Sequence, residues 1–98
     1  MKWPFGKKES QTSTYVIEDI FEINSKGCVV VGTIQGTFVV GKKVTITCQD
    51  GKQIKTTLNA IEVNRQQPKS ASNTPAGLLF KDVEPDSIRK GDTISCES

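Results

Sequence analysis

One segment of the sequence nearly matches a nucleotide-binding loop. Residues 36–43 read Gly-Thr-Phe-Val-Val-Gly-Lys-Lys, against the pattern G-x-x-x-x-G-K-[ST] whose exposed amides and hydroxyl hold phosphates and Mg²⁺. Lys43 stands where the magnesium-binding hydroxyl is required, and a bulky apolar segment replaces the exposed amides. No helix is predicted to follow, so the helix N-terminus that attracts phosphate is missing as well. The sequence therefore predicts no GTP or ATP site.

Histidine is absent from the chain, which excludes Ser-His-Asp and Cys-His nucleophile systems and every histidine-containing zinc site. The three cysteines, Cys28, Cys48 and Cys96, are widely spaced without a C-x-x-C motif. An odd number of unrelated cysteines favours reduced thiols in a cytoplasmic protein. We therefore expect thiols packed in the core, no metal site, no cofactor and no enzymatic activity.

Carboxylates cluster at Glu18, Asp19 and Glu22. A carboxylate pair acts as acid and base only when burial or close approach shifts its pKa values, and the segment requires neither. Two interpretations stay open, a ligand-recognition surface or a solvated strand edge whose charges deter aggregation. Among the basic residues Arg65 is the strongest candidate, because its planar fork pairs with phosphate or carboxylate. Four lysines either join it in a basic patch or are simply solvated: Lys42, Lys43, Lys52 and Lys69.

Strand-forming residues dominate the composition. Nine Val, nine Ile and ten Thr stand against seven Leu, Ala and Met together, and β-branched side chains favour pleated strands over helices. We predict an all-β fold, a small six-stranded antiparallel closed barrel that leaves no sheet edge exposed. Residues 1–13 are expected to form a flexible tail and residues 14–98 the barrel. The expected strands cover residues 15–23, 28–34, 44–48, 54–63, 76–83 and 93–96, with an irregularity in the fourth.

Burial and loop positions follow from the same pattern. Val30, Ile46, Leu79 and Ile94 lie at strand centres and are expected to be nearly buried, while the continuous apolar run from Cys28 to Ile34 is typical of a strand covered on both faces. The longest loop is expected between residues 65 and 75, where function often resides.

The order of several motifs resembles the second domain of elongation factor Tu. The motifs occupy residues 17–23 (Ile-Glu-Asp-Ile-Phe-Glu-Ile), 26–32, 40–44, 61–62, 76–80 and 88–94, so the resemblance covers essentially the whole barrel. It implies the six-stranded barrel of translation proteins, with Gly32 at a close approach of two strands. The chain departs from the family at Thr33, which replaces a basic residue, and in its Gln/Ser/Asn-rich loop after residue 65.

The resemblance also implies a site. In elongation factor Tu the face matched by Glu18, Asp19 and Phe21 holds the aminoacylated end of tRNA, and the positions matched by Glu62 and Arg65 belong to the same surface. The family's GTPase domain has no counterpart here, so we expect a stand-alone accessory domain. The expected function is a non-catalytic module that binds RNA, such as a tRNA end, or a ribosome-associated protein.

A second interpretation involves no RNA. The chain would then be a protein adaptor or regulatory module, and Trp3 and Phe5 among the lysines of residues 1–10 would allow weak membrane contact. Residues 1–10 carry two net positive charges and the remaining residues carry none. The body therefore lacks the general attraction for phosphate that strongly basic nucleic-acid binders show.

Overall fold

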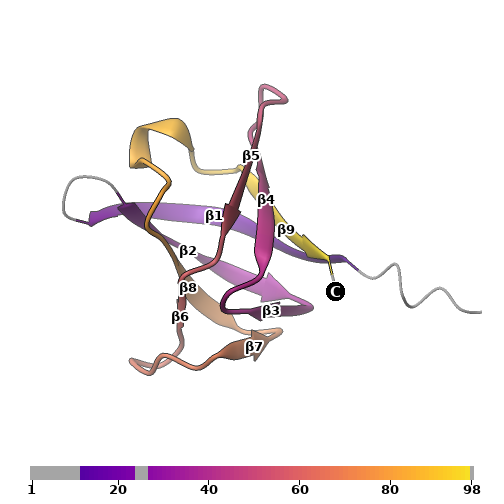
Figure 1. Cartoon of the computed structure of the whole chain (residues 1–98), viewed down its shortest axis with the longest axis vertical. Coiled ribbons are helices and arrows are strands. Elements are labelled where there is room, and N and C mark those ends of the chain that lie inside the picture. Colours follow the sequence, from indigo (N-terminus) through magenta and orange to yellow (C-terminus); the bar gives the residue numbers. More distant parts are fainter. Residues whose placement is uncertain (1–11, 24–26, 98) are drawn as a thin grey trace, which may run out of the picture.

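The computed structural model describes residues 12–23 and 27–97, so the expected tail lies outside these residues except for its last two. Within them the chain forms short strands and one 3-10 turn (Figure 1). The elements are β1 (Thr12–Ile23), β2 (Gly27–Gln35), β3 (Thr37–Val39), β4 (Lys43–Thr47), β5 (Gln53–Thr57), β6 (Ala60–Glu62), β7 (Ser70–Ser72), β8 (Pro75–Phe80), η2 (Pro85–Ser87) and β9 (Thr93–Glu97). The described residues contain no helix long and apolar enough to cross a membrane.

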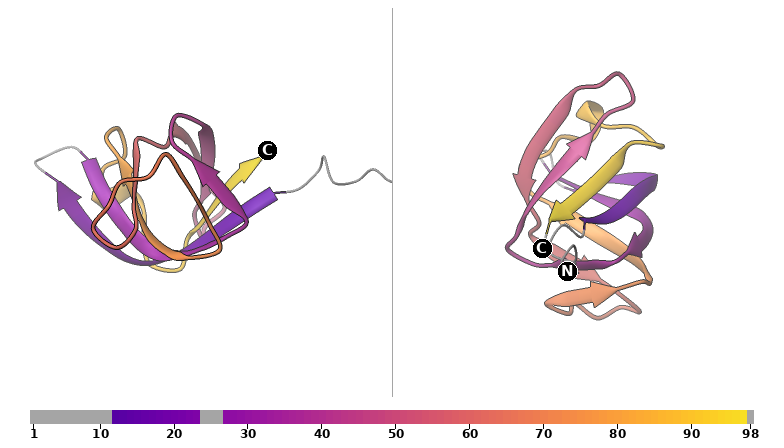
Figure 2. Two further views of the ribbon diagram at one scale, coloured as in Figure 1. Left: turned by 90° about the horizontal axis from the view of Figure 1, so that it is seen from below. Right: turned by 90° about the vertical axis from the view of Figure 1, so that its right-hand side faces the viewer.

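Seven strands form one antiparallel sheet in the order β5-β4-β9-β1-β2-β8-β6, and β3 pairs with β7 in a separate ribbon. The large sheet curls into an open barrel (Figure 2). Its outer strands β5 and β6 are joined by the chain itself, because Leu58 and Asn59 lead directly from one to the other. The N–H groups of these two residues donate to Lys42 O and Leu79 O, both at 3.0 Å.

The all-β barrel prediction is therefore confirmed, with two differences in detail. The described residues form nine strands instead of the six expected, and the sheet is not fully closed by strand pairing. The fourth expected strand breaks at Leu58 and Asn59, as the opposite parities of its apolar residues indicated. β1 begins at Thr12, before the expected start at Tyr15, because Thr12 pairs with Glu97 of β9.

Tyr15 of β1 fills the interior on the core side of the paired strands β1 and β2. Its side chain is fully buried, and its hydroxyl donates to Ala76 O at 2.6 Å and lies 3.1 Å from Val30 O. A Cβ at position 32 would meet Val16 O and, at 3.0 Å, two atoms of the Tyr15 ring. Only glycine fits this close approach of β1 and β2, as the resemblance to elongation factor Tu implies for Gly32.

A bulge in β1 decides which side chains face outward. Ile17 pairs with Gly32, but the next pair is Asp19 with Val31, so Glu18 has no partner on β2. Before this extra residue Tyr15 and Ile17 point into the core, as their burial shows. After it the alternation is shifted by one residue, which is what a β-bulge does to the strand that carries it. Asp19 and Phe21 consequently lie on the outer face of the sheet.

Three of the four predicted core positions, Val30, Ile46 and Ile94, are fully buried. Leu79 is a correction, because it is only partly buried while its neighbours Leu78 and Phe80 are fully buried. Alternation in β8 turns Leu78 inward and Leu79 outward. All three cysteines are free and buried, as expected.

Leu78 and Leu79 provide a direct test of this register. Leu78→Ala should lower the free energy of unfolding by about 2–5 kcal/mol, since it opens a cavity in the core. The same change at Leu79 removes only partly buried surface and should cost about 1 kcal/mol. Urea denaturation of the two variants would measure both values, and equal losses would show that β8 is assigned to the wrong face.

Alkaline pH should weaken the fold. Burial raises the pKa of the Cys28 thiol to about 11 from its usual value of 9.0, and burial followed by the charge of Glu18 raises the pKa of Tyr15. The folded state therefore holds both protons more tightly than the unfolded chain. This contribution is complete below the unfolded pKa values and is lost as pH rises through the folded ones.

We expect the free energy of unfolding to fall between about pH 8 and about pH 10.5, as measured by urea denaturation. A Cys28→Ala variant should show a smaller fall over the same range, because one of the two groups is gone. A stability that stays constant over this range in the parent protein would contradict the buried, neutral state of these groups.

Candidate functional site

An apolar groove lies on the outer face of β1, β2, β8 and β6. Register places Phe21, Val29, Leu79 and Ala60 in one row across these four strands, and Asp19, Val31, Gly77 and Glu62 in the next. Each row alternates with the buried row that faces the core. Three of the four row ends, Phe21, Asp19 and Glu62, thus carry side chains that the resemblance to the tRNA-binding surface singled out.

We call the hollow within these rows the outer groove. Its volume is about 190 Å³, and it is lined by Ile23, Val29, Ala60, Ile61, Glu62, Gln67, Gly77 and Leu79. A Cβ on Gly77 would lie 3.4 Å from Val29 Cγ1 and 3.8 Å from Glu62 Cβ. The missing side chain at Gly77 therefore contributes to the space between Val29 and Glu62, and Glu62 is the lining residue that carries a charge.

The structure brings only some of the predicted site residues together. Glu62 lines the outer groove, and Phe21 is 54 % exposed on the same face, next to Val29. Three strand spacings separate the β1 and β6 ends of the rows, roughly 14 Å. Phe21 is thus exposed on the same face as Glu62 but does not lie beside it, although the resemblance implies that both belong to one binding surface.

The two acidic residues at the bulge have other surroundings. Asp19 Oδ1 lies 3.9 Å from Lys90 Nζ in an exposed ion pair, which contributes little to stability. Its backbone neighbour Ile20 also donates its N–H to the same carboxylate at 2.9 Å. Glu18 is exposed at the bulge itself, close enough to Tyr15 to help raise the pKa of that phenol. Neither carboxylate lines the outer groove.

Arg65 occupies a strained turn that follows β6. Val63 and Gln66 exchange two backbone hydrogen bonds of 2.8 and 2.9 Å, and the residues between them, Asn64 and Arg65, have φ angles of 53° and 67°. Asparagine tolerates this left-handed conformation, whereas arginine rarely adopts it. The expected long loop after Arg65 is also shorter than predicted, because β7 pairs with β3 inside it.

Sequence reasoning missed most of the residues that line the outer groove. The sequence predicts a covered strand at Val29 and a core position at Leu79, and it indicates no site role for Ile23 or Gly77. Gln67 belongs to the loop in which function is expected. The apolar runs of β2 and β8 could have indicated these residues, because such runs are typical of strands that are covered on both faces. In the part of the chain that the structure describes, the outer face of these runs is left partly exposed.

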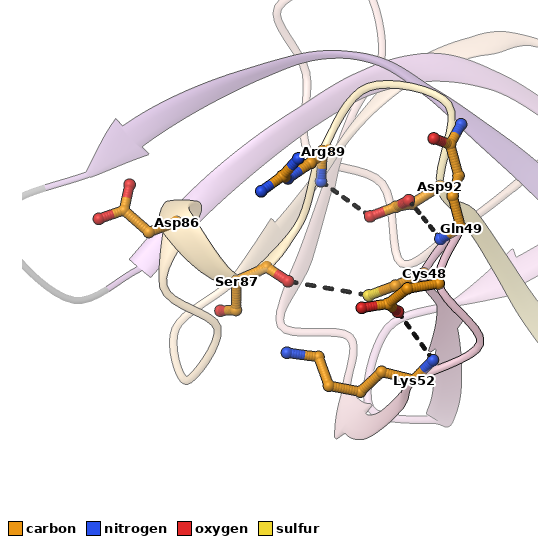
Figure 3. Close-up of a pocket in the computed structure, with 8 residues that line it drawn as sticks. Cys48, Gln49, Lys52, Asp86, Ser87, Arg89 and Asp92 are labelled. Atoms are coloured by element: carbon orange, nitrogen blue, oxygen red, sulfur yellow. Dashed lines mark hydrogen bonds between the residues drawn. The ribbon is translucent and has the colours of Figure 1, made fainter.

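A second hollow, polar and of about 410 Å³, lies between the β4–β5 turn and the segment that leads into β9 (Figure 3). Asp92 is buried on its wall, and its carboxylate accepts hydrogen bonds from Gln49 N at 3.0 Å and Arg89 N at 2.8 Å. Gly91, at φ 95°, passes so close to Gln49 that a Cβ would collide with it. Asp92 therefore has a structural role, because both of its oxygens hold the loops in place.

Residues 36–43, which nearly match a nucleotide-binding loop, also have a structural role. Phe38 is fully buried in β3, and the amides that would cradle phosphate donate within the fold. Val40 N donates to Lys69 O at 2.8 Å and Gly41 N to Leu58 O at 2.8 Å. These amides are not free for an anion, which agrees with the interpretation reached from the sequence.

No family model matches the sequence. The fold is similar to crystal structures of translation elongation factor SelB from Methanococcus maripaludis, in the apo form and in complex with the GTP analogue GppNHp. Each superposes with a TM-score of 0.78 at 20 % identity, over 89 % of this chain and 19 % of the factor. The chain spans about a fifth of the factor's length, so the likeness concerns one domain. This chain has the β-barrel fold of the second domain of elongation factors similar to elongation factor Tu.

Proposed function

We propose that this chain is a non-catalytic binding module of translation, which holds the terminal nucleoside of an RNA against the outer groove. The observation that carries the proposal is an apolar groove with one carboxylate, Glu62, and an exposed aromatic ring, Phe21, on the same face. Resemblance to elongation factor Tu supports it, since the residue types of that factor's tRNA-end surface are kept at these positions. A role in translation would place the protein in the cytoplasm.

The chemistry of the groove suits a nucleoside. Its volume of about 190 Å³ is smaller than the roughly 300–1,000 Å³ of pockets for drug-sized ligands. One base or one amino-acid side chain fits such a space. Unpaired RNA bases stack on aromatic rings, and Phe21 offers one. The Glu62 carboxylate can accept hydrogen bonds from ribose hydroxyls or an amino group.

Arg65 would supply the third contact. Its turn follows directly after Glu62 on the chain, and its guanidinium is exposed. An arginine fork binds phosphate through paired, charge-assisted hydrogen bonds. We infer that Arg65 contacts the phosphate next to the terminal nucleoside. Strain in the backbone at this residue fits the inference, because left-handed non-glycine residues concentrate at ligand sites.

Protein docking is the alternative, and one observation favours it. Val16 and Val31 are 48 % and 37 % exposed on the outer face, beyond the lining of the outer groove. Exposed apolar surface that extends past a small pocket is typical of a protein interface. A protein partner would cover Val16 together with Phe21, whereas a terminal nucleoside in the groove would leave Val16 uncovered.

Single substitutions separate these two functions. The probe is a fluorescein-labelled single-stranded RNA ending in adenosine, with either a free 3′ hydroxyl or a 3′ phosphate. Phe21→Ala should weaken binding of the free end by about 1–3 kcal/mol, the range measured when a stacked base loses its aromatic partner. Val16→Ala is the matched control and should leave the affinity unchanged in a fluorescence anisotropy titration.

The 3′ phosphate adds negative charge and bulk where Glu62 lies, so the blocked RNA should bind more weakly than the free end. Equal affinity for the two RNAs, together with equal effects of Phe21→Ala and Val16→Ala, would contradict recognition of an RNA terminus. Weakened capture of a nuclease-insensitive partner by both variants would establish the protein-docking alternative instead.

The turn at Arg65 gives a second test of function. Arg65→Gly should stabilise the fold by about 0.5–1 kcal/mol, because glycine adopts positive φ without the steric cost that arginine carries. It should also weaken RNA binding, because the guanidinium is removed. Asn64→Gly relaxes the same turn without removing a charge and should leave the affinity unchanged. Urea denaturation and the anisotropy titration measure the two effects, and equal affinities of the two variants would exclude Arg65 from the site.

A further inference from the structure

A groove of different chemistry lies at the other end of the sheet order, on the outer face of β5, β4 and β9. Its volume is about 610 Å³, and its polar lining comprises Lys42, Lys43, Thr45, Lys55, Ser95 and Glu97. We call it the basic groove. The sequence suggested a basic patch that combined Arg65, Lys69, Lys42, Lys43 and Lys52. Of that set, only Lys42 and Lys43 line this groove, and Lys55 lines it as well. Lys52 lines the polar hollow beside Asp92 instead.

Strand register explains the cluster. Lys43 lies opposite Thr57, and Thr45 lies opposite Lys55, so Lys43 and Lys55 are diagonal neighbours on adjacent strands. The backbone positions of diagonal neighbours are about 7–8 Å apart, so two long lysine side chains from these positions can reach the same groove. Lys42 precedes Lys43 in the turn before β4 and adds a third charge. All three side chains are exposed, and within the described ranges none has a carboxylate within 4.0 Å.

This charge is local. Outside residues 1–10 the chain has equal numbers of acidic and basic side chains, yet the basic groove has three lysines against Glu97. The polar hollow next to Asp92 has two cations against three carboxylates, and the outer groove has a single carboxylate. Of these three hollows, the basic groove is therefore the one whose charge attracts an anion.

Its neutral groups indicate which anion. Thr45 pairs with Lys55 of β5 on one side and with Ser95 of β9 on the other, so two hydroxyl groups line the groove beside the lysines. Lysine and hydroxyl side chains are the groups that contact phosphates and sugars in nucleic-acid complexes. Among the residues that the structure describes, none of those lining the groove is aromatic and able to stack a base. We propose that the basic groove binds the phosphate backbone of single-stranded RNA without sequence preference. It would act as a second contact, separate from the terminal nucleoside.

The test uses a single-stranded uridine oligomer with a 3′ phosphate, so that terminal-nucleoside recognition does not contribute. The variant Lys42→Gln, Lys43→Gln, Lys55→Gln removes the basic groove's lysines. The matched control Lys52→Gln, Lys81→Gln, Arg89→Gln removes three exposed charges elsewhere. Each single-strand phosphate contact contributes about −0.7 to the slope of log K against log salt. The groove variant should therefore lose about two units of slope, while the control keeps the slope of the parent protein.

Thermal unfolding of both variants checks that the fold is intact. A charge-retaining variant, Lys42→Arg, Lys43→Arg, Lys55→Arg, should bind the oligomer with the parent slope. The proposal is overturned by equal slopes in the groove variant and the parent, by equal losses in the groove and control variants, or by no binding of the parent at low salt. Competition by polyglutamate as effective as that by RNA would also overturn it, in favour of an acidic protein surface. None of these results bears on binding of a free 3′ end.

Discussion

The packing of the Tyr15 ring against Gly32 is the constraint on which the rest of the barrel depends. The ring occupies space that any side chain at position 32 would fill, and its buried hydroxyl needs an acceptor, which Ala76 O provides. One side chain thereby holds β1, β2 and β8 together from the inside. The outer groove lies on the opposite face of these strands, so the contacts of Tyr15 also hold the backbone that forms the floor of the groove.

The bulge at Glu18 and the loop around Asp92 act at the same point of β1. Gly91 N donates to Ile17 O at 2.8 Å, and Ile17 N donates to Asp92 O at 2.9 Å, directly where the regular pairing of β1 with β9 ends. Ile17 is thus held on both sides before the extra residue shifts the alternation. Phe21 faces outward because of this shift. A regular strand would have turned its ring into the core.

The two halves of the curled sheet present different chemistry to the outside. The hollow of the β1, β2, β8 and β6 half is lined mostly by apolar side chains and by the Glu62 carboxylate. The hollow of the β5, β4 and β9 half is lined by lysines, hydroxyl groups and Glu97. The RNA strand that we propose as ligand is divided in the same way, with bases that can stack on apolar surface and phosphates that carry charge. Both surfaces belong to the rigid sheet, and rigid elements hold binding groups more precisely than loops do.

The all-β class, the burial of the cysteines and the break near Leu58 could be predicted from the sequence, because they follow from residue type and from alternation along one strand. The close approach at Gly32 was implied by the resemblance to elongation factor Tu. The resemblance to elongation factor Tu also assigned Phe21 to a binding surface, where its ring is exposed. The sequence could not place Leu79, since an apolar run has the same pattern whichever face it turns to the core. The fold alone determines which face of β2 and β8 stays open and that Lys55 joins Lys42 and Lys43. It also places Phe21 and Glu62 at opposite ends of neighbouring rows on the outer face. These facts depend on cross-strand register and on the shift at the bulge, which bring together residues far apart in the chain.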